Sequence, residues 1–333
     1  MRTNLKFAGV ILLASGVTAA ADGAGGMKDH AAAVTPNWDI AFGAYTASDY
    51  IFRGITQSAH WPSVSAYSEW RYNPMKDLQL YVGSSTESID YPNRAAAEVD
   101  FYGGFRPTFN KLALDFGFWY YWYPGGQLFN GEGPAGPNPN CTNGFKTGPG
   151  LGLPGNPSGC NIYEADLSYW EVYGKAAYTV NDTVTLGANA YYSPSWLNEG
   201  ADGLWAAGNV KLTAPSGWIP TVLPKGTGAF FLGDVGHYWF GQTNAFYSNT
   251  DLPDYTSWDL GVTFTYKVFS LDFRYYDTDL SEASCNVLTA DHTAKFSAGN
   301  ITSTNPSGLG SDWCGAAFVV KASFDLTAET NLK

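Results

Sequence analysis

Residues 257–268 alternate between apolar and polar side chains, and this pattern constrains the fold more than any other feature of the chain. The even positions from Trp258 to Val268 are all aromatic or aliphatic, whereas the odd positions from Asp259 to Lys267 are polar, charged or glycine. Successive side chains of a β-strand point to opposite faces, so a period of two gives one apolar and one polar face. A helix would scatter the same residues around its circumference. We therefore predict a strand here.

The same alternation recurs in eleven further segments, so the chain is predicted to be almost entirely β. In the last of them, 316–326, Phe318 and Phe324 alternate with Lys321. The others span 38–44, 64–72, 98–106 and 112–118, or begin near Leu78, Glu164, Val184, Leu204, Gly228 and Ser270.

The connections between these segments differ in length in a regular way. If the first strand rises from the periplasm, the inner turns are short: 73–77, 107–111, 181–183 and Phe269 alone. The outer loops are longer: 49–61, 86–96, 124–162, 194–203, 241–256 and 281–313. The exception is 214–227, which is long where a short inner turn is expected. Short periplasmic turns and long extracellular loops are typical of transmembrane barrels, and we predict an all-β, antiparallel up-and-down barrel of about 12 strands.

Composition favours a barrel over a soluble sandwich or jelly roll, the main alternative for alternating strands. Only 14% of the residues are charged and 16% are aromatic, whereas soluble proteins average about 25% charged residues. A sandwich would turn its polar face to water, but here that face holds mostly Gly, Thr, Asn, Ser and Tyr. Large aromatic residues stand near strand ends, at positions 50 and 52, 70 and 72, 119–123, and 191–192. We interpret them as girdles at the membrane interfaces.

The first 21 residues have the pattern of an export signal. Arg2 and Lys6 precede an apolar run of about eleven residues and the small run Ala19–Ala21. A helix needs about 20 apolar residues to span a bilayer, so a membrane anchor is the less favoured alternative. We predict a signal peptide at 1–21, a flexible segment at 22–36, an outer-membrane barrel at 37–326 and a C-terminal tail at 327–333. Without the leader, 16 basic residues accompany 30 acidic ones, a net charge of −14 that argues against nucleic acid as a partner.

Four cysteines are expected to form disulfides in the oxidising compartment outside the inner membrane. Cys141 and Cys160 lie in one long loop, and Cys285 and Cys314 lie at the two ends of another. Of three possible connectivities, pairing within each loop disturbs the barrel least and restrains both loops. The spacings do not fit a zinc site.

Several segments together resemble the TorF family of porin-like proteobacterial outer-membrane proteins, which has no established function. The most specific match is SDYIFRGITQS, residues 48–58, and weaker ones are EVDFYGGFR (98–106), YWEVYGKAAY (169–178), SWDLGVTFTY (257–266) and LDFRYYDTDLS (271–281). The likeness runs from about residue 37 to 326. It implies an outer-membrane barrel and a channel, without naming a solute.

Charged residues on the predicted inner faces are candidates for a solute path. The candidates are Asp49, Arg53, Glu69, Arg71, Glu98, Asp100, Arg106, Glu171, Lys175 and Arg274, and the same faces hold Asp39, Asp115, Lys211, Asp259, Lys267, Asp272 and Lys321. Both signs can line a wet lumen, or they can pair across strands into a static plug. Arg53 at the outer mouth could bind a solute, or it could fold the first loop inward by pairing with Asp49 or with a lumen carboxylate.

We predict a porin-like channel for passive diffusion of small hydrophilic solutes in the outer membrane of a Gram-negative bacterium. Outer-membrane lipids and a small solute are the expected partners, and the sequence does not indicate an oligomeric state. One alternative is a non-conducting barrel that serves as structure, adhesin or receptor, and another is a secreted carbohydrate-binding β-protein. No GxSxG, HExxH or glycine-rich phosphate motif occurs in the required context, so we expect no enzyme, cofactor or metal site.

Overall fold

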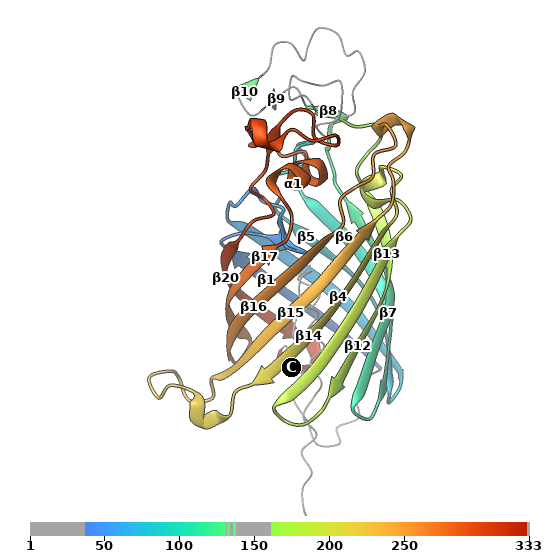
Figure 1. The fold of residues 1–333 in the computed structure, drawn as a ribbon. Coiled ribbons are helices and arrows are strands. Elements are labelled where there is room, and N and C mark those ends of the chain that lie inside the picture. Colours follow the sequence, from blue (N-terminus) through green and yellow to red (C-terminus); the bar gives the residue numbers. More distant parts are fainter. Residues whose placement is uncertain (1–36, 131, 134–135, 138–160, 332–333) are drawn as a thin grey trace, which may run out of the picture.

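A computed structural model describes residues 37–130, 132–133, 136–137 and 161–331 and forms a closed antiparallel barrel of twelve strands (Figure 1). Each strand of the barrel pairs with the barrel strands before and after it in the chain, and the first pairs with the last. The predicted fold class and strand number are confirmed. The predicted signal peptide, the segment 22–36, Cys141 and Cys160 lie outside the described residues.

The barrel strands run from one end of the cylinder to the other and are joined in chain order. They are β1 (Trp38–Ala47), β4 (Ser63–Met75), β5 (Leu78–Glu87), β6 (Glu98–Phe109), β7 (Leu112–Trp122), β12 (Tyr169–Thr179), β13 (Val184–Ser193), β14 (Gly203–Thr213), β15 (Gly228–Phe240), β16 (Tyr255–Tyr266), β17 (Phe269–Thr278) and β20 (Ala317–Thr327). Closure is made by β1 and β20, where Ala44 lies opposite Phe324.

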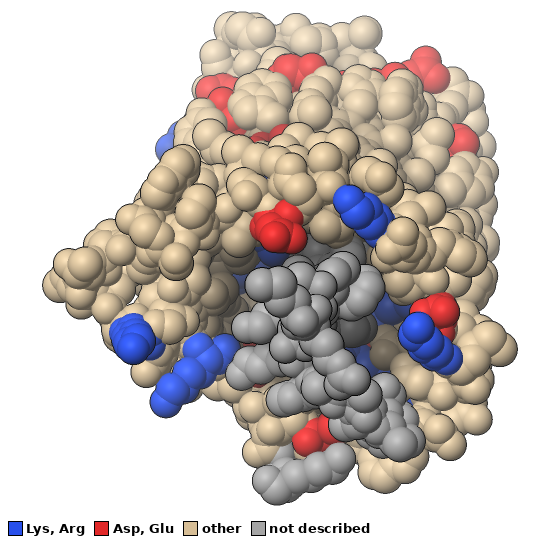
Figure 2. Space-filling view, turned by 90° about the horizontal axis from the view of Figure 1, so that it is seen from below, with Lys and Arg blue, Asp and Glu red and all other residues tan. Residues whose placement is uncertain are grey.

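The apolar face of each strand points outward, as the alternation predicts. In β16, Leu260 is 63% exposed on the outside, whereas Asp259 and Thr263 are buried inside the cylinder. A soluble sandwich would bury the apolar face between two sheets, but this single closed sheet buries its polar face instead. Seen from its inner end, the molecule carries charged side chains around the rim of the opening (Figure 2). None of the helices in the described part of the chain is long and apolar enough to cross a membrane.

The turns after β4 and β6 are shorter than the sequence predicts, because the strands extend further, and the turn after β16 is displaced. Strands β16 and β17 are joined by residues 267–268 alone, so the turn is not at Phe269. Lys267 has a φ of +55° in this turn and is exposed, which corrects its expected place on the inner face. Strand β4 likewise continues through most of the predicted turn 73–77, with a register shift between Tyr72 and Met75. The long connection 214–227 is a real inner loop and projects below the barrel (Figure 1).

Shorter elements occupy the outer loops and the inner end. The outer ones are β2 (Ile51–Phe52), β3 (Ile55–Thr56), β8 (Phe129–Asn130), β9 (Glu132–Gly133), β10 (Gly136–Pro137), β11 (Asn161–Ile162), β18 (Lys295–Phe296), β19 (Leu309–Gly310), the helix α1 (Glu282–Thr289), and the 3₁₀ turns η3 (Trp196–Asn198), η5 (Ala245–Tyr247) and η6 (Ala298–Asn300). The inner ones are η4 (Ser216–Trp218) and α2 (Ala328–Asn331). The predicted disulfide between Cys285 and Cys314 is present and ties α1 to the start of β20.

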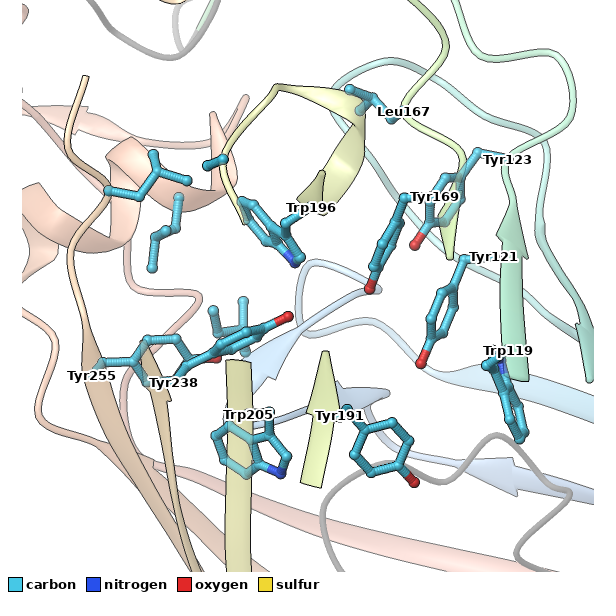
Figure 3. Packing of buried hydrophobic residues seen from close by; sticks show 14 of the residues in the cluster. Trp119, Tyr121, Tyr123, Leu167, Tyr169, Tyr191, Trp196, Trp205, Tyr238 and Tyr255 are labelled. Carbon is cyan, nitrogen blue, oxygen red and sulfur yellow. The ribbon is translucent and has the colours of Figure 1, made fainter. Parts of the chain in front are cut away.

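Many aromatic residues that the sequence assigns to membrane girdles lie inside the barrel instead. They form part of one buried cluster of mainly aromatic side chains inside the barrel (Figure 3). Because positions alternate, Trp122 and Tyr192 do face outward, but their neighbours Tyr121, Tyr123 and Tyr191 face inward. The girdle interpretation is therefore wrong for the inward half of these residues, which instead line the site described next.

Candidate functional site

The β2–β3 hairpin folds from the first outer loop into the lumen and carries Arg53 at its tip. Gly54 at the tip has a φ of +83°, and a Cβ there would lie 2.5 Å from Ser257 and from Thr278 on β16 and β17. The Arg53 side chain extends to β12, where its two terminal nitrogens donate to the Glu171 carboxylate at 2.8 and 2.7 Å. In the strand order, β12 stands nearly across the barrel from β16 and β17. The hairpin and this ion pair together therefore span the lumen.

Arg53 and Glu171 are fully buried, and their surroundings compensate both charges. The guanidinium carbon lies 4.9 Å from the ring centroids of Tyr191 and Tyr238 and 5.4 Å from that of Trp205. The hydroxyl of Tyr238 also donates to Glu171, at 3.3 Å. A bidentate carboxylate pair enclosed by aromatic rings is a favourable place for a buried guanidinium. The barrel interior thus already holds one organic cation, from its own chain.

Asp49 organises the loop behind this hairpin and does not pair with Arg53. Its carboxylate accepts hydrogen bonds from Thr56 (2.5 Å) and Ser58 (3.0 Å), and it contacts His60 Nδ1 at 2.7 Å. The hydrogen bond to Asp49 raises the pKa of His60 above its ordinary value, although partial burial opposes this. Of the two pairings that the sequence allows for Arg53, the structure contains the one with a lumen carboxylate.

Two groups of charged side chains line opposite sides of the barrel. We call them the inner groups, because they lie nearer the inner end than the pair of Arg53 and Glu171. On β4, β6 and β7, Arg106 donates to both oxygens of Glu69 at 2.9 and 3.0 Å and to Asp115 at 3.2 Å, and Arg71 also donates to Glu69. On β16 and β17, Arg274 donates to Asp259 and, at 3.1 Å, to Asp272.

Each of these groups nearly balances its own charge. The first holds two cations and two anions. In the second, Lys321 lies opposite Asp272 in the register with β20 and adds a second cation, and Asp234 lies opposite Asp259 in the register with β15 and adds a third anion.

Three buried carboxylates gather at the outer ends of β5 and β6. Among the described residues, oxygens of Glu87, Glu98 and Asp100 all lie within 4.8 Å of one another, which is close enough to hold one metal ion. Both oxygens of Glu98 already accept hydrogen bonds, from Tyr50 at 2.6 Å and from Tyr123 at 2.9 Å. Hard cations such as Ca²⁺ prefer oxygen ligands of this kind. The group is also a concentration of acidic side chains beside the outer mouth.

A further cavity of about 60 Å³ lies above the hairpin, beneath the outer loops. Aromatic side chains contribute eight of its eighteen lining residues, and Leu288 of α1 and Trp313, next to Cys314, close it from the outer side. In Figure 3, Trp196, Tyr169 and Tyr238 are arranged around a common space. The loop residue Glu199 also lines this cavity and is completely buried.

All ten residues predicted to line a solute path face the interior, but they do not form one site. Asp49 belongs to the loop network, Arg53 and Glu171 to the lumen-spanning pair, and Glu98 and Asp100 to the acidic group. The inner charged groups contain Glu69, Arg71, Arg106 and Arg274, and Lys175 lies 4.9 Å from the ring of Tyr173.

The sequence analysis missed Glu87 and Glu199. Glu87 continues the alternation of its strand and could have been found from that pattern. Glu199 lies in a loop, where side chains do not alternate regularly between apolar and polar, so the sequence does not indicate which way Glu199 points.

Comparison with known proteins finds a family model that matches part of the chain and several solved structures of outer-membrane barrels. Residues 31–135 match a family model described as "Bacterial protein of unknown function (Gcw_chp)". A search of curated proteins finds no match.

Among solved structures, the chain is similar to the NanC porin (7% identity, 86% of this chain and 100% of that chain, TM-score 0.41). It is also similar to LpxR from Salmonella typhimurium (10% identity, 86% and 99%, TM-score 0.37). A third is OmpT, an outer membrane protein of Vibrio cholerae (11%, 87% and 99%, TM-score 0.35). These identities are too low, and the superpositions too loose, to transfer a function.

Proposed function

We propose that this protein is a narrow outer-membrane channel for passive diffusion of small hydrophilic solutes in a Gram-negative bacterium. The observation that carries the proposal is the division of the closed sheet into an apolar outside and a charged inside, with Leu260 and Asp259 as adjacent examples. An apolar outer band suits lipid, and charges of both signs suit a wet lumen. The resemblance of residues 48–58 to the porin-like TorF family supports the same function.

The outer half of the path favours cations. The charge of Arg53 is matched by Glu171, and the two inner charged groups are close to balanced. Glu87, Glu98 and Asp100 add negative charge at the outer end. A pore mouth lined by one sign of charge concentrates ions of the opposite sign. The solutes expected to pass most readily are therefore small and neutral or positively charged.

A second candidate function is a barrel that is closed at rest. It is favoured by one specific observation, namely that the β2–β3 hairpin and the fully buried pair of Arg53 and Glu171 reach across the lumen. A twelve-stranded barrel is intermediate between small barrels filled by side chains and wide porins, so both states are physically available.

Single-channel conductance in planar bilayers tests the proposal and separates the two candidates. The wild type should give small, discrete steps. Arg53→Ala combined with Glu171→Gln should give larger steps, because the hairpin loses its anchor without leaving a buried charge unpaired. Lys225→Ala is the matched control, since it removes one positive charge from the exposed inner loop, and its steps should equal those of the wild type. If neither the wild type nor the double variant conducts, the channel proposal is wrong.

A further inference from the structure

Glu199 is a buried carboxylate in the outer part of the molecule to which neither proposed function assigns a role. It follows directly after η3, in a turn where Leu197, Asn198 and Gly200 all have positive φ. The backbone carbonyl of Glu199 accepts from the amide of Asn244 at 3.0 Å, and its amide donates to the carbonyl of Trp196 at 3.0 Å. The turn is therefore fixed from two sides, which places the side chain in the cavity.

Among the described residues, the Glu199 side chain has no hydrogen-bond partner at either oxygen, although its exposure is 0%. The hydroxyl of Tyr163, which lines the same cavity, also has no partner within the part of the chain that the structure describes. Burial raises the pKa of Glu199 well above its ordinary value. Burial and then the charge of Glu199 raise the pKa of Tyr163, and both residues line the same cavity. Orphaned buried acceptors are rare and costly, and they indicate a missing partner that donates hydrogen bonds.

The rest of the cavity wall specifies the charge and shape of such a partner. Glu199 is the single charged residue among those described as lining it, and eight of the eighteen lining residues are aromatic. Aromatic faces attract cations and repel anions. Leu167 and Leu288 contribute an apolar part of the wall, suited to a short hydrocarbon chain. The volume of about 60 Å³ restricts the occupant to a few heavy atoms.

We propose that this cavity binds the primary ammonium group of a small alkylamine, with Glu199 as its counter-ion and Tyr163 as a second hydrogen-bond acceptor. A primary ammonium has three N–H donors, enough for both carboxylate oxygens and the phenol oxygen. The alkyl part lies against the leucines, and the surrounding rings stabilise the charge. Binding at this site does not require that the barrel conducts. The binding proposal can therefore be refuted without refuting the channel proposal, and the reverse also holds.

Isothermal titration calorimetry on the full-length protein in detergent tests the site with propylammonium chloride and with 1-propanol, a neutral probe of similar size. We expect saturable binding of propylammonium and none of 1-propanol. Glu199→Gln keeps the shape of the side chain but removes its charge, and it should weaken propylammonium binding by about tenfold or more. The matched control is Glu164→Gln, an exposed outer-loop carboxylate that accepts from Asn244, and its affinity should equal that of the wild type.

Three outcomes would overturn the assignment: no saturable binding of propylammonium, equal binding of 1-propanol, or equal affinity in Glu199→Gln. Heat-dependent gel mobility checks that the variant is folded. If the variant does not fold, the comparison of the two probes on the wild type still decides the question.

Discussion

At the scale of single residues, the pairing of Arg53 with Glu171 shows what sequence can and cannot predict. The motif around residues 48–58 leaves two roles open for Arg53: to bind a solute, or to fold its loop inward by pairing with Asp49 or a lumen carboxylate. It cannot identify the partner, because Glu171 lies 118 residues away and meets Arg53 only after the barrel closes. The same holds for Glu199, because its burial depends on loops from several parts of the chain.

Removal of one member of this pair should destabilise the protein more than removal of both. Glu171→Gln leaves the Arg53 guanidinium buried without its counter-ion, which costs about 3–5 kcal/mol. Arg53→Met combined with Glu171→Gln removes both charges and should cost clearly less. Urea unfolding in lipid vesicles, followed by tryptophan fluorescence, measures the two free energies of unfolding. Equal losses in the single and double variants would contradict a coupled pair.

The contact between His60 and Asp49 should make the first outer loop sensitive to pH. The pKa of His60 is raised in the folded loop, so the protonated imidazole favours the folded state. This contribution is complete below the ordinary pKa of about 6.5 and is lost as the pH rises through the raised value. NMR titration of the His60 ring should give the raised pKa, and Asp49→Asn should return it toward the ordinary value. An unchanged pKa in Asp49→Asn would refute the assignment.

At the scale of the elements, the strands were predictable because a period of two survives in every one of them. Lipid outside and water inside act on adjacent residues of the same strand, so the pattern is local. The ends of the strands are less predictable, since Lys267 continues the alternation of β16 yet lies in its turn. Turn conformation depends on backbone geometry that the alternation of side chains does not report.

Arginine substitutions on opposite faces of β16 should have opposite kinds of effect. Leu260→Arg places a charge against lipid near the middle of the strand, which costs about 2–4 kcal/mol at the bilayer midplane. Thr263→Arg places the same group inside, where Thr263 now donates to Asp272 at 2.5 Å. Refolding into lipid vesicles should be impaired only by the first change, and ion selectivity should be altered only by the second. Similar behaviour of the two variants would mean that the inside and outside are wrongly assigned.

At the scale of the whole molecule, the contents of the lumen were the part that sequence could not predict. Alternation gives the direction of Tyr121 or Tyr191, but an aromatic residue near a strand end fits an interfacial girdle as well as a filled interior. The choice depends on the hairpin and on α1, which cover the outer opening and supply apolar partners such as Phe52 and Leu288. Outer loops therefore determine how much of the barrel remains open.

The distribution of charge over the whole lumen leads to a prediction about selectivity. The inner groups nearly cancel locally, so the acidic group at the outer ends of β5 and β6 should set a modest preference for cations. Reversal potentials in a KCl gradient should show this preference, and Asp100→Asn should reduce it. Asp182→Asn, an equal change in an exposed inner turn, should leave it unchanged.

Salt dependence separates this charge effect from a size effect. The Debye length falls from about 10 Å at 0.1 M salt to about 3 Å at 1 M, so a preference set by charge should decline with concentration, although less steeply than for exposed carboxylates because the three of the acidic group are buried. A preference that is constant over this range would show that the hairpin selects ions by size, and that the carboxylates at the mouth are neutral or already hold a cation.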